Sequence, residues 1–263
     1  AATRRGACRS ASRTPSLLLV RTMPAAMTTP SRAARERRKA AELEEQIKGE
    51  KFVEFRLACD DGDATGCHSL GEWWALVKED FGKAADLYRT NCLERRHGPS
   101  CYNMGRLHAN GRGVERSAPA TLEFFARGCE AGTADACQYG ALLLSTGKHV
   151  PEDKPRAARM LERGCNELTG GAQCCAKLGV LRLQGDEAAG VARDLPLAAR
   201  LFRRACVDAR HAPSCSNLAV MTHRGEGVSK DESEARRLMD DANELFKQER
   251  VRRSRWGGRG DDA

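Results

Sequence analysis

Small apolar residues and helix-capping residues recur along the chain in five similar segments. Each segment opens with a cysteine, and a glycine or alanine follows four positions later, one helical turn further along. Each then contains an Asp or Ser suited to cap the N-terminus of a second helix. The opening cysteines are Cys67, Cys101, Cys137, Cys175 and Cys215, and the capping residues are Asp80, Ser117, Asp153, Asp194 and Asp231. The pattern predicts two helices in each segment.

The spacing within the segments shows which parts have a constant length. Four capping residues lie 12 positions before the next cysteine, and the fifth lies 12 positions before Asn243. The distance from the opening cysteine to the cap instead varies from 13 to 19 residues. Gly111, Gly147 and Gly225 stand where a first helix can end in the left-handed conformation. We therefore predict an all-α, right-handed αα-hairpin solenoid of five repeats, in which the loop before the second helix takes up insertions.

The two ends of the chain depart from the repeat pattern. Residues 1–31 form a basic leader, with Arg, Ser and Thr but no acidic residue. The leader is either a transit peptide or an extension of the reading frame, with Met23 or Met27 as the true start. Residues 32–58 indicate a charged N-terminal helical segment, and the repeats occupy residues 59–249. Residues 250–263 show no apolar period and predict a basic, disordered tail.

Ten of the twelve cysteines fall into pairs at the boundaries between repeats. The pairs are Cys59 with Cys67, Cys92 with Cys101, Cys129 with Cys137, Cys165 with Cys175, and Cys206 with Cys215. Two antiparallel helices that meet at such a turn can bring the Cα atoms to the roughly 5.5 Å that a disulfide prefers. A zinc or dithiol redox site would usually need a CxxC spacing, which the chain lacks. We predict five structural disulfides, with Cys8 and Cys174 left over as unpaired thiols.

The distribution of charge argues against nucleic-acid binding. The chain has a net charge of +8, but residues 51–249 hold 28 basic and 29 acidic side chains. The excess of positive charge therefore lies in the two ends, and the repeats lack the basic excess that a nucleic-acid footprint requires. No apolar run approaches the length of a membrane span.

Three further features could carry chemistry. Ser145 to Lys148 read STGK, the S-x-x-K spacing of penicillin-binding enzymes, but Ser145 stands at a helix end and the partner motifs are absent. His97 and His211 occur in similar contexts and could bind metal or haem, although we favour side chains that contact the last carbonyls of the second helix. Trp73 and Trp74 serve either a docking surface or structural packing. We therefore predict no catalytic, cofactor-binding or metal-binding residues.

Residues 101–129, CYNMGRLHANGRGVERSAPATLEFFARGC, resemble a Sel-1-like repeat, a relative of the tetratricopeptide repeat. Because this unit has a cysteine at each end, it resembles the repeat units of the disulfide-rich, β-lactamase-like Hcp subset of these proteins. Within that subset, residues 52–249 resemble the mitochondrial cytochrome c oxidase assembly factors more than the secreted bacterial members.

The resemblance implies a non-enzymatic interaction scaffold of the mitochondrial intermembrane space that supports assembly of the respiratory chain. Its expected partners are respiratory-chain assembly components, and the expected protein is a monomer without a cofactor, nucleic-acid partner or membrane span. Two alternatives stay open. One is a secreted Hcp-like protein with weak penicillin-binding or β-lactamase activity, and the other is a generic Sel-1-like adaptor.

Overall fold

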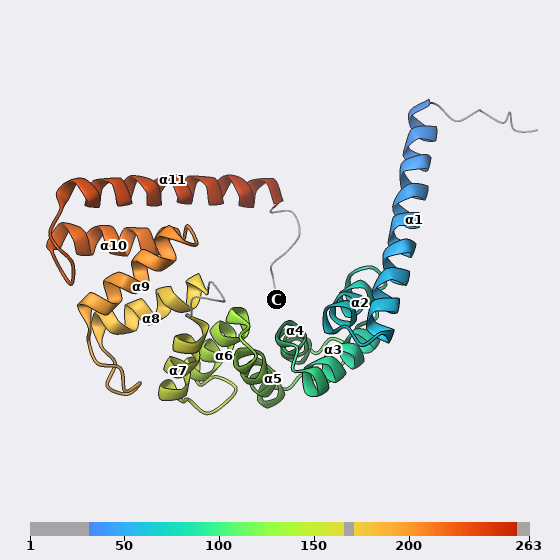
Figure 1. Cartoon of the computed structure of the whole chain (residues 1–263), viewed down its shortest axis with the longest axis horizontal. Coiled ribbons are helices and arrows are strands. Elements are labelled where there is room, and N and C mark those ends of the chain that lie inside the picture. The colour runs from blue at the N-terminus through green and yellow to red at the C-terminus, as the bar shows by residue number, and fades with distance from the viewer. Residues whose placement is uncertain (1–31, 166–170, 257–263) are drawn as a thin grey trace, which may run out of the picture. The chain divides into compact units, whose positions relative to one another are not determined.

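The structure is a computed structural model that describes residues 32–165 and 171–256. These residues form eleven α-helices (Figure 1). The helices are α1 (Arg32–Asp60), α2 (Ala64–Leu76), α3 (Phe81–Arg95), α4 (Gly98–Asn110), α5 (Ala118–Glu130), α6 (Ala134–Thr146), α7 (Lys154–Gly164), α8 (Ala172–Gln184), α9 (Leu195–Val207), α10 (Ala212–Arg224) and α11 (Glu232–Trp256). None of the described helices combines the length and apolar character needed to cross a membrane.

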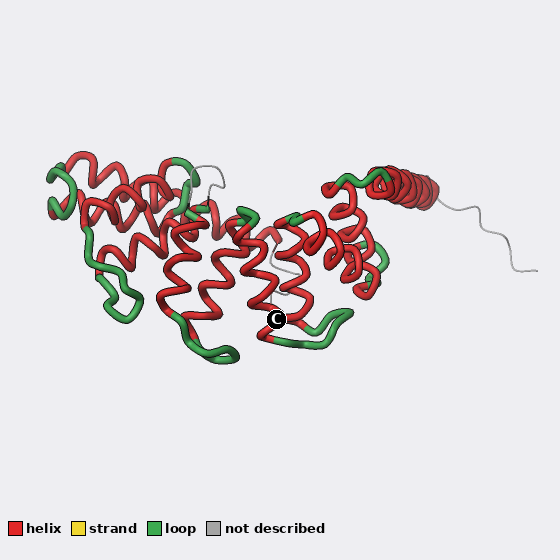
Figure 2. The backbone as a smooth tube through the Cα atoms, turned by 60° about the horizontal axis from the view of Figure 1, so that its bottom comes forward, coloured by secondary structure: helices red, strands yellow, loops and turns green. Residues whose placement is uncertain are grey.

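Contacts divide the chain into two units, residues 1–45 and residues 46–263. The described part of the first unit is the beginning of α1, where Arg38 and Glu42 form an exposed ion pair of 2.8 Å. The second unit holds the rest of α1 and all the other helices. In it, helices α2 to α11 pair in sequence as five hairpins, α2 with α3 through α10 with α11, joined by the loops drawn in green in Figure 2. The predicted all-α hairpin repeat is confirmed.

The second helix of each hairpin begins at the predicted capping residue. Asp80, Ser117, Asp153 and Asp194 each accept a hydrogen bond from the backbone N–H three residues later, at 2.9 to 3.3 Å. The carboxylate of Asp231 accepts from two backbone N–H groups at the start of α11. These bonds satisfy donors that a helix start would otherwise leave without a partner. The capping pattern in the sequence therefore locates every second helix.

Small residues on the first helices make room for large side chains of the second helices. A Cβ atom on Gly71 would lie 2.6 Å from the ring of Tyr88, and one on Gly179 would lie 2.7 Å from the ring of Phe202. Both rings are buried, so the glycine and the ring form one close-packed layer within the hairpin. This packing explains the glycine one helical turn after the opening cysteine in the hairpins where it contacts such a ring, which are those of Gly71, Gly105 and Gly179.

Two loop glycines bring one hairpin against the hairpin before it. Gly113 and Gly227 have φ angles of +68° and +72°, which side-chain-bearing residues rarely adopt. A Cβ atom at either position would also collide with backbone atoms of Phe81 or Leu195. These loops therefore require glycine both for their backbone conformation and for contact with the start of the preceding second helix.

The last helix is longer than the sequence pattern predicts. We expected a disordered tail from residue 250, but α11 continues to Trp256, so the prediction is wrong for residues 250–256. Once Ala235 and Ala242 of α11 are buried, the helix is nucleated, and adding arginine-rich turns costs little because Arg is a good helix former. The remaining tail residues lie outside the described part of the chain.

Candidate functional site

Disulfides join consecutive helices at the hairpin boundaries: the first joins α1 to α2, and the others join the second helix of one hairpin to the first helix of the next. They link Cys59 to Cys67, Cys92 to Cys101, Cys129 to Cys137, Cys165 to Cys175, and Cys206 to Cys215, the five pairs that the sequence spacing indicates. The Cα atoms within each pair lie 4.3 to 4.8 Å apart. This is closer than the separation of roughly 5.5 Å that is typical of disulfides.

The residues that precede the paired cysteines explain this close approach. The ten residues directly before the paired cysteines are all small or short: Ala58 and Gly66, Asn91 and Ser100, Gly128 and Ala136, Gly164 and Cys174, Ala205 and Ser214. At the first four boundaries the two residues lie against one another. A Cβ atom on Gly66 would lie 2.5 Å from the Cβ of Ala58, and one on Gly128 would lie 2.8 Å from the Cβ of Ala136. The small or short residue before each paired cysteine is visible in the sequence, but the sequence predictions above do not use it.

Cys174 is the thiol that this boundary packing places beside Gly164. It is buried, it forms no disulfide, and its Sγ lies 3.4 Å from the carbonyl oxygen of Ala134. Burial, reinforced by the negative charge of Asp135, raises the pKa of the Cys174 thiol to about 12. The thiol therefore acts as a small packing group, equivalent in position to Ser100 and Ser214. Cys8 lies outside the described residues.

One boundary is closed by a buried hydrogen-bond network as well as a disulfide. The amide of Asn91 donates to the Ser100 hydroxyl and to the Ala64 carbonyl, each at 2.8 Å, and Asn91 and Ser100 are both fully buried. The Nδ1 atoms of His68 and His97 lie 3.1 and 2.9 Å from the same hydroxyl. Among the described residues, Oδ1 of Asn91 has no hydrogen-bond partner.

The histidines in matching contexts cap first helices rather than end second helices. His97 and His211 are the N-cap residues of α4 and α10, and Nδ1 of His97 accepts the N–H of Ser100 at 3.3 Å. Our expectation that their side chains would contact the carbonyls of the preceding helix is wrong. Arg96 and Arg210, with φ of +53° and +51°, reverse the chain just before each histidine, so that the ring turns to the helix that follows.

The structure does not place these histidines in one common site. His97 and His211 belong to different hairpins, and no group of three metal-ligating side chains occurs among the described residues. Burial lowers the pKa of His97 and of His211 below the ordinary value. His68, which the sequence pattern does not single out, lies beside His97 with ring centroids 5.1 Å apart and ring planes tilted by 52°. These side chains are best explained as parts of the hairpin boundaries.

The adjacent tryptophans pack the end of α1 against the first hairpin. The ring of Trp73 lies 4.6 Å from the ring of Phe52, and its indole N–H donates to the Lys48 carbonyl at 3.2 Å. The ammonium nitrogen of Lys83 lies over the ring of Trp74, 4.0 Å from the ring centroid. Both tryptophans are half-buried, and the contacts described above are those of structural packing, the second of the two roles considered for them.

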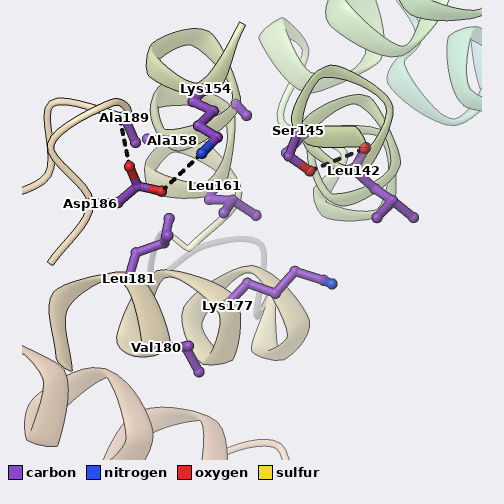
Figure 3. Close-up of a pocket in the computed structure, with 12 residues that line it drawn as sticks. Leu142, Ser145, Lys154, Ala158, Leu161, Lys177, Val180, Leu181, Asp186 and Ala189 are labelled. Atoms are coloured by element: carbon purple, nitrogen blue, oxygen red, sulfur yellow. Dashed lines mark hydrogen bonds and ion pairs between the residues drawn. The ribbon is translucent and has the colours of Figure 1, made fainter. Parts of the chain in front are cut away.

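A mostly apolar hollow between α6, α7 and α8 is a candidate binding site (Figure 3). Its volume is about 280 Å³, and alanine, leucine and valine side chains form most of its wall. Ser145 lines it, but the Ser145 hydroxyl donates to the Leu142 carbonyl at 3.1 Å, and Lys148 is not among the lining residues. The STGK stretch therefore does not bring a serine and its lysine together in this hollow.

The loop of residues 185–194 forms one side of the hollow and is the longest insertion between a first and a second helix. Backbone hydrogen bonds between Asp186 and Val191 close it into a tight turn, and Ala189 and Val191 are buried against Ala158. The turn holds Asp186 3.8 Å from the ammonium group of Lys154 on α7. The long loop that the sequence spacing indicates before α9 therefore forms one side of the hollow and positions Asp186 there.

The fold and its cysteine pairs define a class: αα-hairpin repeat proteins whose successive hairpins are joined by disulfides. The model of the family described as Sel1 repeat matches residues 98–133, 134–167, 172–206 and 212–244. The chain belongs to the Sel1 repeat family.

Related chains and solved structures agree with this assignment. The chain is 30% identical over 206 residues to cytochrome c oxidase assembly factor 7 of Xenopus tropicalis, covering 76% of this chain and 87% of that protein. It is also 30% identical to cytochrome c oxidase assembly factor 7 of Homo sapiens, covering 78% and 92%. The crystal structure of a Sel1 repeat protein from Oxalobacter formigenes matches with a TM-score of 0.62 at 23% identity, covering 75% and 79%, which supports the fold.

Proposed function

We propose that this protein is a non-enzymatic scaffold that supports assembly of cytochrome c oxidase. The observation that carries the proposal is its likeness, at 30% identity over most of both chains, to proteins named cytochrome c oxidase assembly factor 7. The repeat architecture fits this role, because stacked hairpins present extended surfaces for protein partners.

The disulfides support a location in the mitochondrial intermembrane space. Five disulfides in one chain need an oxidising compartment in which to form. The arginine-rich, acid-free character of residues 1–31 is typical of mitochondrial transit peptides. An oxidising compartment within mitochondria satisfies both observations. The proposed partners are assembling respiratory-chain components, and the proposed form is a monomer.

Depletion of the protein and protease protection test the two halves of the proposal. Cells that lack the protein should contain less assembled cytochrome c oxidase on native gels while transcripts of its subunits are unchanged. In intact mitochondria a tagged chain should resist added protease until the outer membrane is ruptured. Unchanged oxidase levels would overturn the assembly role, and a cytosolic chain with reduced thiols would overturn the location.

A further inference from the structure

We propose that the hollow between α6, α7 and α8 binds a partner segment that presents an apolar side chain next to a carboxylate. The occupant is taken to be a protein segment because stacked hairpins present surfaces to protein partners, and a hollow of about 280 Å³ has room for individual side chains. The inference rests on the proposed function in one respect, namely that the occupant comes from a client protein.

Two apolar residues of the wall stand at positions that are charged in an equivalent hollow of the same chain. Between α2, α3 and α4 the corresponding hollow is lined by Glu72 and Arg106, five residues after their opening cysteines. At those two positions the hollow between α6, α7 and α8 has Leu142 and Val180. The repeat therefore tolerates charged side chains here, and folding alone does not require Leu142, which is 44% exposed. The Leu142 side chain both lines the hollow and reaches solvent, so it can contact an apolar side chain of a partner.

The charges that line the hollow leave one positive group for the occupant. Lys154 is held by Asp186 at 3.8 Å and by Glu152 at 3.9 Å, so its charge is balanced within the protein. Lys177 is half-buried on α8, and the ion pairs of the described residues around the hollow do not include it. In Figure 3 its side chain extends along α8 towards α6, away from the pair formed by Lys154 and Asp186. The equivalent residue in the α2–α4 hollow is the neutral Asn103.

This combination defines the chemistry of the occupant. Leu161 and Leu181 provide a surface for an apolar side chain, and Lys177 at the edge attracts an acidic residue beside it. A segment with a basic residue in that place would bring two positive charges together. The hollow should therefore discriminate by charge as well as by apolar contact.

Fluorescence anisotropy with three labelled peptides tests this inference on the purified, oxidised full chain. The acidic probe is Ser-Gly-Asp-Leu-Phe-Asp-Gly-Ser, the basic probe has lysine for both aspartates, and the polar probe has serine for leucine and phenylalanine. We expect the acidic probe to bind about fivefold more tightly than the basic probe, the discrimination that one partly exposed ion pair supplies. The polar probe should show no measurable binding.

Three variants locate the interaction. Lys177→Glu should invert the preference between acidic and basic probes, and Lys177→Met, which keeps the apolar stem, should abolish it. Leu142→Glu should weaken the acidic probe about tenfold by removing apolar contact and adding negative charge. The matched control is Val220→Glu, because Val220 occupies the same repeat position on α10, is 40% exposed, and lies outside the hollow. It should leave the affinity unchanged, and circular dichroism should show all four variants folded.

Several outcomes would overturn the inference. They are absence of binding by the acidic probe at 1 mM, equal affinities for the acidic and basic probes, or the same loss from Val220→Glu as from Leu142→Glu. A wild-type dimer in sedimentation that Leu142→Glu dissociates would mean that a second copy fills the hollow instead. These results are independent of the depletion experiment: charge-selective binding with normal oxidase levels would refute the proposed function and leave the hollow as a binding site.

Discussion

Removal of a single disulfide should destabilise the protein by an amount that can be calculated from the loop that it closes. Replacing Cys129 and Cys137 by alanine opens a link between residues that are 8 positions apart. In the chain-entropy model this raises the entropy of the unfolded chain by about 8 cal/mol/K, which corresponds to about 2.5 kcal/mol at 25 °C. Both cysteines are almost fully buried, so the substitution also removes two packed sulfur atoms.

Cys174→Ala supplies the control for the loss of packing. Cys174 is also buried, at 1% exposure, but it forms no disulfide. We expect the Cys129→Ala/Cys137→Ala variant to lose about 2.5 kcal/mol more than twice the loss in the Cys174→Ala variant. Urea denaturation followed by circular dichroism at the helical wavelength measures both losses under the same oxidising conditions. If the double variant loses no more than twice the control, the disulfide does not stabilise the boundary and the reasoning is refuted.

Three other predictions concern the buried polar groups and the spare thiol. Burial lowers the pKa values of His68, His97 and His211, so the unfolded chain binds more protons than the folded chain and the unfolding free energy should fall as the pH is lowered below 6.5. Urea denaturation at several pH values should show a weaker pH dependence for His211→Gln than for the wild type. Asn91→Ala removes one buried and one partly buried hydrogen bond and should cost about 1–3 kcal/mol in unfolding free energy. Asn243→Ala, at an exposed position, should cost less than about 0.5 kcal/mol. Iodoacetamide at pH 8 should not alkylate Cys174 in the folded protein, because the thiol is buried and its pKa is raised to about 12. Fast alkylation of Cys174, detected by mass spectrometry, would contradict that burial.

The hairpin architecture and the cysteine pairs could be predicted because each depends on short-range spacing. A capping residue acts on the backbone N–H groups two or three residues away, so Asp153 or Asp194 indicates where its helix begins. The disulfides likewise join residues 8 to 10 positions apart, across a single turn. Interactions of this range leave a periodic trace in the sequence, and five repeats make the trace visible.

The orientation of the histidines and the nature of the hollow could not be predicted in the same way. The direction of the His97 ring depends on the left-handed conformation of Arg96, which nothing in an arginine side chain signals. The hollow unites Leu142, Lys154, Lys177 and Asp186 from four separate segments, and the periodic pattern does not say which repeat positions line a common surface. The continuation of α11 to Trp256 was missed for another reason, because an exposed helix needs no apolar period.

A rescue experiment in cells that lack the protein tests the central proposal most directly. The measured quantity is the amount of assembled cytochrome c oxidase on native gels after re-expression of the full chain. One version is directed to the intermembrane space and the other is retained in the cytosol, at equal expression. We predict that the first restores the assembled complex and that the second, whose disulfides cannot form stably in a reducing compartment, does not. Equal rescue by both versions, or normal amounts of the complex before any re-expression, would contradict the account.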